Sequence, residues 1–167
     1  MSDHPDRSYE TLTYDDLGRL SERVIGRLRE KEKPIGKLIC IGLIQNGARH
    51  YLNSQKGEPG IKPGLHDFDV LCLFSELATE TRQRAISAES KLDKFGACRE
   101  CGRYRTRKID IFCKRLAPTN SIEASVASYF ENGKGWAQRA AEGPCIGMWP
   151  NELRGKELWR GTKPAKA

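Results

Sequence analysis

The sequence contains no long apolar run. No stretch of its 167 residues approaches the eighteen or so apolar residues of a membrane-spanning helix. The first ten residues, MSDHPDRSYE, also lack the basic start and apolar segment of a secretory signal peptide. There is no internal repeat and no recognisable domain linker. These absences lead us to expect one cytoplasmic domain without a membrane partner.

The six cysteines do not indicate disulfide bonds. Cys40, Cys72 and Cys113 each lie inside an apolar run typical of a buried strand. Free cysteine is a common small residue of protein cores. Thiols stay reduced inside cells, so this interpretation agrees with an intracellular protein.

Cys98 and Cys101 have the spacing of half a zinc site. A second pair is missing, although Cys145, His50 or His66 could complete a set of ligands. The surrounding residues do not have the strand before and helix after that a thioredoxin-like motif needs. Zinc at Cys98 and Cys101 therefore remains an alternative use of this pair.

Positive charge is concentrated in one part of the chain. The net charge is +7, and residues 94–115 contain eight Lys or Arg against Glu100 and Asp110, which gives +6. Such a basic stretch suits a polyanion such as RNA, or a triphosphate. Tyr104, Arg105 and Arg107 could grip a nucleic acid there. The alternative is a solvated basic face that improves solubility.

The apolar pattern predicts an α/β (α+β) fold, in which helices flank a mixed β-sheet within a single domain over residues 13–160. Thr13 is the expected cap of the first helix, and Asn120 with Glu123 forms an expected capping box. Residues 1–12 and 161–167 are expected to be flexible, and 75–103 carry no clear element. The expected helices cover residues 13 to about 33, 48–52, 120–132 and 135–141; the expected strands cover 37–44, 67–74 and 104–112, with Pro118 as a stop.

Two acidic residues interrupt the second expected strand, at Asp67 and Asp69. Side chains alternate between the two faces of a strand, so both carboxylates share one face, with Cα atoms about 6 to 7 Å apart. Aspartate is a poor strand residue. Its pairing here requires compensation for repulsion and lost hydration.

A third acid, Asp110, points away from its apolar neighbours Ile109 and Ile111 in the next clear strand. If the two strands are neighbours, three carboxylates converge on one surface, and such oxygen ligands suit Mg²⁺ or Mn²⁺. In the alternative interpretation each acid pairs with a nearby base. Lys108 lies on the same face as Asp110, and Arg105 or Arg107 could also reach it.

This order of elements resembles the nucleotidyltransferase superfamily, which includes polymerase beta, CCA-adding enzymes and small antitoxin-type transferases. The resemblance covers roughly residues 38–112. It implies a nucleotidyltransferase-like fold, with Asp67, Asp69 and Asp110 as metal ligands and catalytic residues. Asn46, Gly47 and Arg49 fall at the turn that leads a helix in that superfamily, which implies a nucleotide-binding role.

The chain also resembles a group of uncharacterised bacterial nucleotidyltransferase-like proteins. The shared elements are an Asp-Phe-Asp-Val strand, here at residues 67–70, and a Lys-Phe-Gly element, here at 94–96. Ala48 stands where the superfamily has a second Gly or a Ser. Alanine offers no hydroxyl to a phosphate, but backbone N–H groups at a helix start can still bind one.

The resemblance implies metal-dependent transfer of a nucleoside monophosphate (NMP) from a nucleoside triphosphate (NTP) to an unknown acceptor hydroxyl. Mg²⁺ or Mn²⁺ would be the cofactor, and RNA or a protein the acceptor. One alternative is a catalytically degenerate module that binds RNA or a protein through residues 99–107. Another is an antitoxin-like or defence-associated component. His66, directly before the acids, either touches substrate or is a loop residue without a role.

Overall fold

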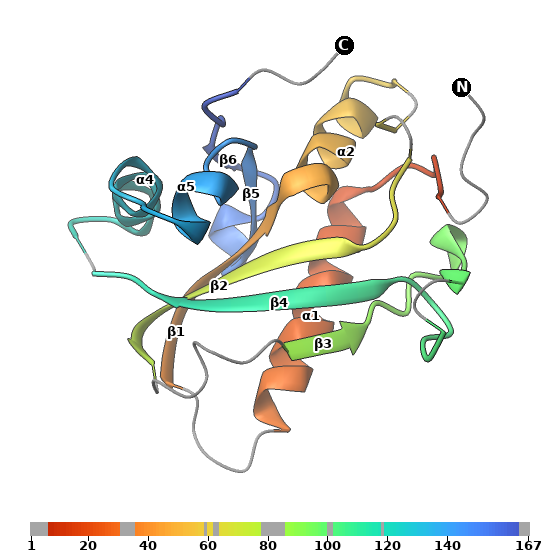
Figure 1. Ribbon diagram of the computed structural model, residues 1–167, viewed down its shortest axis with the longest axis horizontal. Coiled ribbons are helices and arrows are strands. Elements are labelled where there is room, and N and C mark those ends of the chain that lie inside the picture. The colour runs from red at the N-terminus through yellow and green to blue at the C-terminus, as the bar shows by residue number, and fades with distance from the viewer. Residues whose placement is uncertain are drawn as a thin grey trace.

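The computed structural model describes residues 7–30, 36–58, 60–61, 64–77, 86–99, 102–117 and 119–163. It has a mixed six-stranded sheet flanked by four helices in one domain, as expected (Figure 1). The described residues also contain two short 3₁₀ turns, η1 and η3. The elements are α1 (Tyr14–Arg29), β1 (Gly36–Ile44), α2 (Gln45–Gln55), β2 (Phe68–Leu77), β3 (Ile86–Glu89), η1 (Asp93–Phe95), β4 (Lys108–Arg115), α4 (Ile122–Glu131), α5 (Trp136–Ala140), β5 (Cys145–Trp149), η3 (Asn151–Leu153) and β6 (Glu157–Trp159).

The strand order is β3-β4-β2-β1-β5-β6. β2 and β4 are parallel neighbours, whereas the other pairs are antiparallel. β1 lies between β2 and β5, which agrees with the nearly continuous apolar sequence that predicted a central strand. The neighbouring positions of β2 and β4 bring together the two strands that carry the acids.

Helix α1 begins where the sequence predicts it. The Thr13 side chain accepts a hydrogen bond from the Asp16 backbone N–H at 3.2 Å, and the Asp16 carboxylate accepts one from the Thr13 N–H at 2.8 Å. This reciprocal capping box satisfies two N–H groups that a helix start leaves without partners. The helix ends at Arg29 and packs its apolar stripe on one face of the sheet.

Two apolar cores lie on opposite faces of the sheet. The first contains Leu17, Leu20 and Val24 of α1 and alternate side chains of β2. Figure 1 shows α1 crossing one face of the sheet. The second contains Leu71 and Leu73 of β2 with residues from α4 and α5. The prediction that alternate β2 side chains point in opposite directions is therefore confirmed. Cys40, Cys72 and Cys113 are buried and free, as expected.

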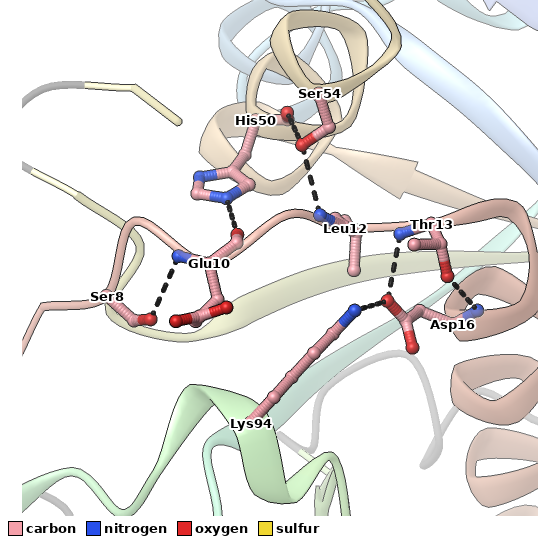
Figure 2. A network of polar contacts seen from close by, with 8 residues as sticks. All are labelled: Ser8, Glu10, Leu12, Thr13, Asp16, His50, Ser54 and Lys94. Carbon is pink, nitrogen blue, oxygen red and sulfur yellow. Dashed lines mark hydrogen bonds and ion pairs between the residues drawn. The ribbon is translucent and has the colours of Figure 1, made fainter. Parts of the chain in front are cut away.

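The N-terminal segment over residues 7–12 is packed against the domain, which differs from the flexible segment expected over 1–12. Leu12 is fully buried, and its N–H donates to Ser54 Oγ at 3.0 Å. His50 Nε2 donates to the Glu10 carbonyl at 2.6 Å (Figure 2). Side chains of α2 thus hold the segment in place. Residues 1–6 lie outside the described part of the chain.

Lys94 forms an ion pair with Asp16, so η1 is tied to the capping box of α1 (Figure 2). At the other end of the chain, Thr162 and Lys163 donate backbone hydrogen bonds to Ala141 and Glu142. The flexible tail expected over 161–167 is therefore bonded to the domain as far as Lys163. Residues 164–167 lie outside the described ranges.

Several expected boundaries were wrong. Helix α4 is capped by Ser121, whose Oγ accepts from the Ala124 N–H at 3.0 Å, and not by Asn120. The third expected strand begins at Lys108, four residues later than predicted, because the chain before it forms turns. The sequence pattern missed β3, β5 and β6, which are short. Pro118 lies outside the described residues. No helix in the described ranges is long and apolar enough to cross a membrane.

Candidate metal centre

The parallel pairing of β2 and β4 places Asp69 directly opposite Asp110. Asp67 precedes the first residue of β2 and lies on the same face as Asp69. One carboxylate oxygen from each of the three residues lies within 4.8 Å of the others. The sequence prediction that these acids converge on one surface is therefore confirmed by the geometry.

The acids lie where the cover of α4 and α5 ends. Leu71 and Leu73 are each 1% exposed in the second core, whereas Asp67 and Asp69, further back along the same strand face, remain partly open to solvent. A carboxylate under the helices would need a buried partner. At the uncovered end, the acids form an accessible group.

Partial burial and crowding raise the affinity of Asp67 and Asp69 for protons. Burial raises the pKa of Asp69 to about 7, and the neighbouring Asp67 and Asp110 add to the increase. Burial also raises the pKa of Asp67, together with the charge of Asp110 and a hydrogen bond between these two side chains. A large fraction of metal-free protein therefore retains a proton on Asp69 near neutral pH, and a bound cation would have to displace it.

Lys108 partly offsets the negative charge. Its Nζ lies 3.1 Å from Asp110 Oδ1, with the two side chains 25% and 29% exposed. The positive charge of Lys108 lowers the pKa of both Asp67 and Asp69, although burial and mutual repulsion outweigh it. The expected pairing of Asp110 with Lys108 is thus present alongside the three-acid cluster.

Arg107 holds the chain segment that carries Asp67. Its side chain is 3% exposed; its Nε donates to the Phe95 carbonyl at 3.0 Å and its Nη1 to the His66 carbonyl at 3.1 Å. The Phe95 ring packs edge-on against Phe68 at 5.5 Å between centroids. Arg107 therefore holds two segments in place near the start of β2, one at Phe95 and one at His66.

The sequence interpretation of Arg107 as a nucleic-acid contact is wrong, because its guanidinium is buried among carbonyl groups. A signal for this was present. Arg107 has the same parity as the core residues Ile109 and Ile111, so strand alternation directs it toward the buried face. The sequence interpretation missed the buried position of Arg107 because it considered only the charge of this residue.

Some of the other basic residues between 94 and 115 contact groups within the fold. Lys94 pairs with Asp16, and the Lys114 ammonium lies 4.6 Å from the centre of the Trp136 ring. The basic stretch is therefore not one continuous surface. The other exposed basic side chains in the described part of this stretch are Arg99, Arg103, Arg105 and Arg115.

His66 lies beside Cys98, with 3.4 Å between its Nδ1 and the Cys98 Sγ. Of the additional zinc ligands suggested by the sequence, His66 is the one that the structure places near Cys98. His50 instead bonds to Glu10, and Cys145 lies in the second core. Cys101 lies outside the described residues, so the expected zinc pair stays a prediction.

The junction between β1 and α2 lies next to the acids, because Ile44 pairs with Asp69. The chain turns into the helix at Gln45, which has a φ of 60°, and no side chain caps the described helix start. Asn46 is exposed, and its Oδ1 accepts from Arg49 Nη1 at 3.2 Å. The first N–H groups of a helix have no partner within the helix. In α2 these N–H groups begin one residue after Ile44, the strand residue that pairs with Asp69.

Gly47 is buried at this junction. A side-chain carbon added there would lie 2.9 Å from Leu43 Cδ1. The absence of a side chain therefore allows α2 to pack closely on β1. The nucleotide-binding roles expected for Asn46, Gly47 and Arg49 remain predictions.

The donor set fits a hard divalent cation. It consists of three carboxylates from two adjacent strands, and Mg²⁺ and Mn²⁺ prefer oxygen ligands of this kind. The chain matches no protein-family model, no curated protein and no solved structure.

Proposed function

We propose that the protein is a metal-dependent nucleotidyltransferase, which moves an NMP group from an NTP to an acceptor hydroxyl. The observation that carries this proposal is the convergence of Asp67, Asp69 and Asp110 beside an uncapped helix start. The order of these elements along the chain, which resembles the nucleotidyltransferase superfamily, gives further support.

Asp67, Asp69 and Asp110 would hold Mg²⁺ or Mn²⁺, and the bound ion supplies positive charge that offsets the charge developing on the phosphate oxygens. Backbone N–H groups at the start of α2, with Arg49, would bind the triphosphate. The partial burial of the acids strengthens these electrostatic interactions.

Asp110 would accept the proton of the attacking hydroxyl. The hydroxyl oxygen forms a bond to the α-phosphorus while the bond from that phosphorus to the β-phosphate oxygen breaks. Pyrophosphate leaves with the bonding electron pair, and the acceptor keeps the NMP group. Transfer of this kind depends on positioning and charge stabilisation, so the loss of one carboxylate should be severe.

A thermal-shift titration with Mn²⁺ and each NTP tests the proposal. A ligand that binds the native state raises its stability. We expect wild type to gain several degrees in Tm with one or more NTPs, only when Mn²⁺ is present. The Asp67→Asn/Asp69→Asn variant should show no gain. A folded wild-type protein without any metal-dependent nucleotide shift would contradict the proposal.

Lys108 favours a second candidate, a degenerate module that binds RNA or a protein partner. Its ammonium, 3.1 Å from Asp110, already supplies a positive charge at the acids. Replacing it in Lys108→Met separates the two candidates. A transferase should bind Mn²⁺ before and after the change, with affinity raised severalfold after it. A degenerate module should bind Mn²⁺ only after the lysine has been removed.

We also propose a cytoplasmic location. Cys40, Cys72, Cys98, Cys113 and Cys145 are free thiols, which suits a reducing compartment. Fractionation of cells that produce the tagged protein would test this.

A further inference from the structure

A basic pocket of about 410 Å³ lies between α2 and the chain that flanks β5 and β6. Arg49 and Lys56 line it from α2 and its C-terminal cap, while Arg160 and Lys163 line it from the residues after β6. The volume is in the range of pockets that bind small ligands. Residues far apart in the sequence thus form one concave, positively charged surface.

Gly161 lines the pocket, and Gly143 lies beside the pocket residue Arg49. The Arg49 guanidinium occupies the space beside Gly143, where a side-chain carbon would lie 2.9 Å from its Nη2. Gly161 has a φ of 94° and lies against the backbone of Glu142 and Gly143. Any larger residue at Gly143 would displace Arg49.

The positive charge in the pocket is incompletely neutralised. No acidic residue is among the described residues that line it. Lys163 pairs with Glu142 at 2.9 Å, and the highly exposed Arg160 has a long contact of 3.9 Å with Glu157. Lys56 has no ion pair within the described part of the chain. An anion would therefore find unsatisfied positive charge here.

The register of the sheet places this pocket close to the acids. Ile44 pairs with Asp69 on one side and with Cys145 on the other, so the three residues form a row across adjacent strands. With about 4.8 Å between strands, Asp69 and Cys145 lie about 10 Å apart. Pro144, next to Cys145, lines the pocket. A phosphate-bearing molecule held in the pocket can therefore extend to the acids.

We infer that the basic pocket binds phosphate groups of the acceptor, the molecule whose hydroxyl receives the NMP group. Its assignment to the acceptor rests on the proposed nucleotidyl transfer, whereas phosphate binding by the pocket does not. The triphosphate of the NTP would lie at the acids and the start of α2, with Arg49 shared between that site and the pocket. The second substrate thus approaches from the side of β5.

The first test is the affinity for inorganic tripolyphosphate in EDTA, measured by isothermal titration calorimetry. The pocket variant is Lys56→Glu/Arg160→Glu, which changes two exposed side chains. Its matched control, Arg103→Glu/Arg105→Glu, makes the same change of charge in the exposed part of the basic stretch. We expect the pocket variant to bind tripolyphosphate about tenfold or more weakly, and the control to lose less than about threefold. Circular dichroism checks that both remain folded.

Equal loss of tripolyphosphate affinity in the two variants, or no binding by wild type, would contradict phosphate binding by the pocket. Asp69→Asn should bind tripolyphosphate as wild type does, so a failure of the transferase proposal would not be mistaken for a failure of this one. The pocket variant should also keep any Mn²⁺-dependent NTP shift. Loss of that shift in the pocket variant would indicate that the pocket binds the NTP, and would contradict its assignment to the acceptor.

A second arm identifies the source of the phosphates. A fluorescent single-stranded RNA of about ten nucleotides replaces tripolyphosphate. Binding that weakens about tenfold in the pocket variant, but not in the control, would support a nucleic-acid backbone. With tripolyphosphate binding lost in the pocket variant, RNA affinity equal in all three proteins would support a small phosphorylated acceptor.

Discussion

The two faces of β2 differ sharply although they belong to one strand. One face carries Phe68, Val70, Cys72 and Phe74, all buried under α1 and its neighbours. The other begins with Asp67 and Asp69 and becomes apolar only where α4 and α5 cover it. The comparison shows that the buried core and the candidate metal site lie on opposite faces of one strand. Substitutions on the two faces should therefore have opposite consequences.

The largest expected effect is on the apolar face. Phe68 is fully buried and packs edge-on against Phe95. Phe68→Ala should lower the free energy of unfolding by about 3 to 5 kcal/mol, because it leaves a cavity. Urea denaturation measures this. Tyr14→Ala removes an aromatic ring that is 48% exposed and should cost less than about 1 kcal/mol. Equal losses of unfolding free energy in Phe68→Ala and Tyr14→Ala would contradict the stabilising role of the buried face.

Arg107 connects the two faces and should have the next largest effect. Arg107→Met leaves the carbonyls of Phe95 and His66 without this donor and should cost about 2 to 4 kcal/mol. Because Asp67 follows His66, Mn²⁺ affinity should also fall, by about tenfold. Denaturation and Mn²⁺ titration measure the two effects. The exposed Arg105→Met is the matched control and should change neither. If Arg107→Met keeps the stability and Mn²⁺ affinity of wild type, Arg107 does not position Asp67.

The acidic face should respond in the opposite direction to the apolar one. Asp69→Asn removes repulsion with Asp67 and Asp110 and should raise the stability of metal-free protein by about 1 to 2 kcal/mol. The same variant should lose Mn²⁺ binding. Denaturation in EDTA and Mn²⁺ titration measure these effects. Asp15→Asn, at an exposed acid of α1, should give no increase in stability and keep Mn²⁺ binding. Destabilisation of Asp69→Asn would contradict the electrostatic account.

A pH dependence sharpens the same comparison. The pKa of Asp69 is raised to about 7 in the folded state, whereas an unfolded aspartate has a pKa of about 4. Folded protein therefore holds the proton more tightly, and this residue contributes a loss of stability as pH rises from about 4 to 7. Denaturation in EDTA across this range measures it. Asp69→Asn should reduce the slope, and an unchanged slope would assign the titration to other groups.

Strand periodicity was enough to predict the acidic face. Asp67 and Asp69 alternate with apolar residues, so their common direction follows from the sequence alone. Asp110 alternates with Ile109 and Ile111 in the same way within its own strand. The parallel pairing of β2 with β4 does not follow from periodicity, because it depends on the crossover between the two strands. That crossover contains β3, whose four residues have too little apolar pattern to be recognised.

Contacts between distant residues could not be predicted in the same way. The sequence suggested His66 only as one of three residues that could lie near Cys98, and no pattern selected it. No pattern indicates that the C-terminal residues meet α2 to form the basic pocket. These depend on how loops close over the sheet. The short β5 and β6 also depend on their neighbours, because β5 pairs with β1 on one side and with β6 on the other.

The most direct test of the central claim is the binding of Mn²⁺ itself in wild type, Asp69→Asn and Asp15→Asn. Electron paramagnetic resonance follows the binding at about pH 8, which is above the pKa of about 7 of Asp69. The three-acid site predicts saturable binding in wild type and in Asp15→Asn, and its loss in Asp69→Asn while that protein stays folded. Binding that is equal in all three proteins, or missing from folded wild type, would contradict a metal centre at Asp67, Asp69 and Asp110.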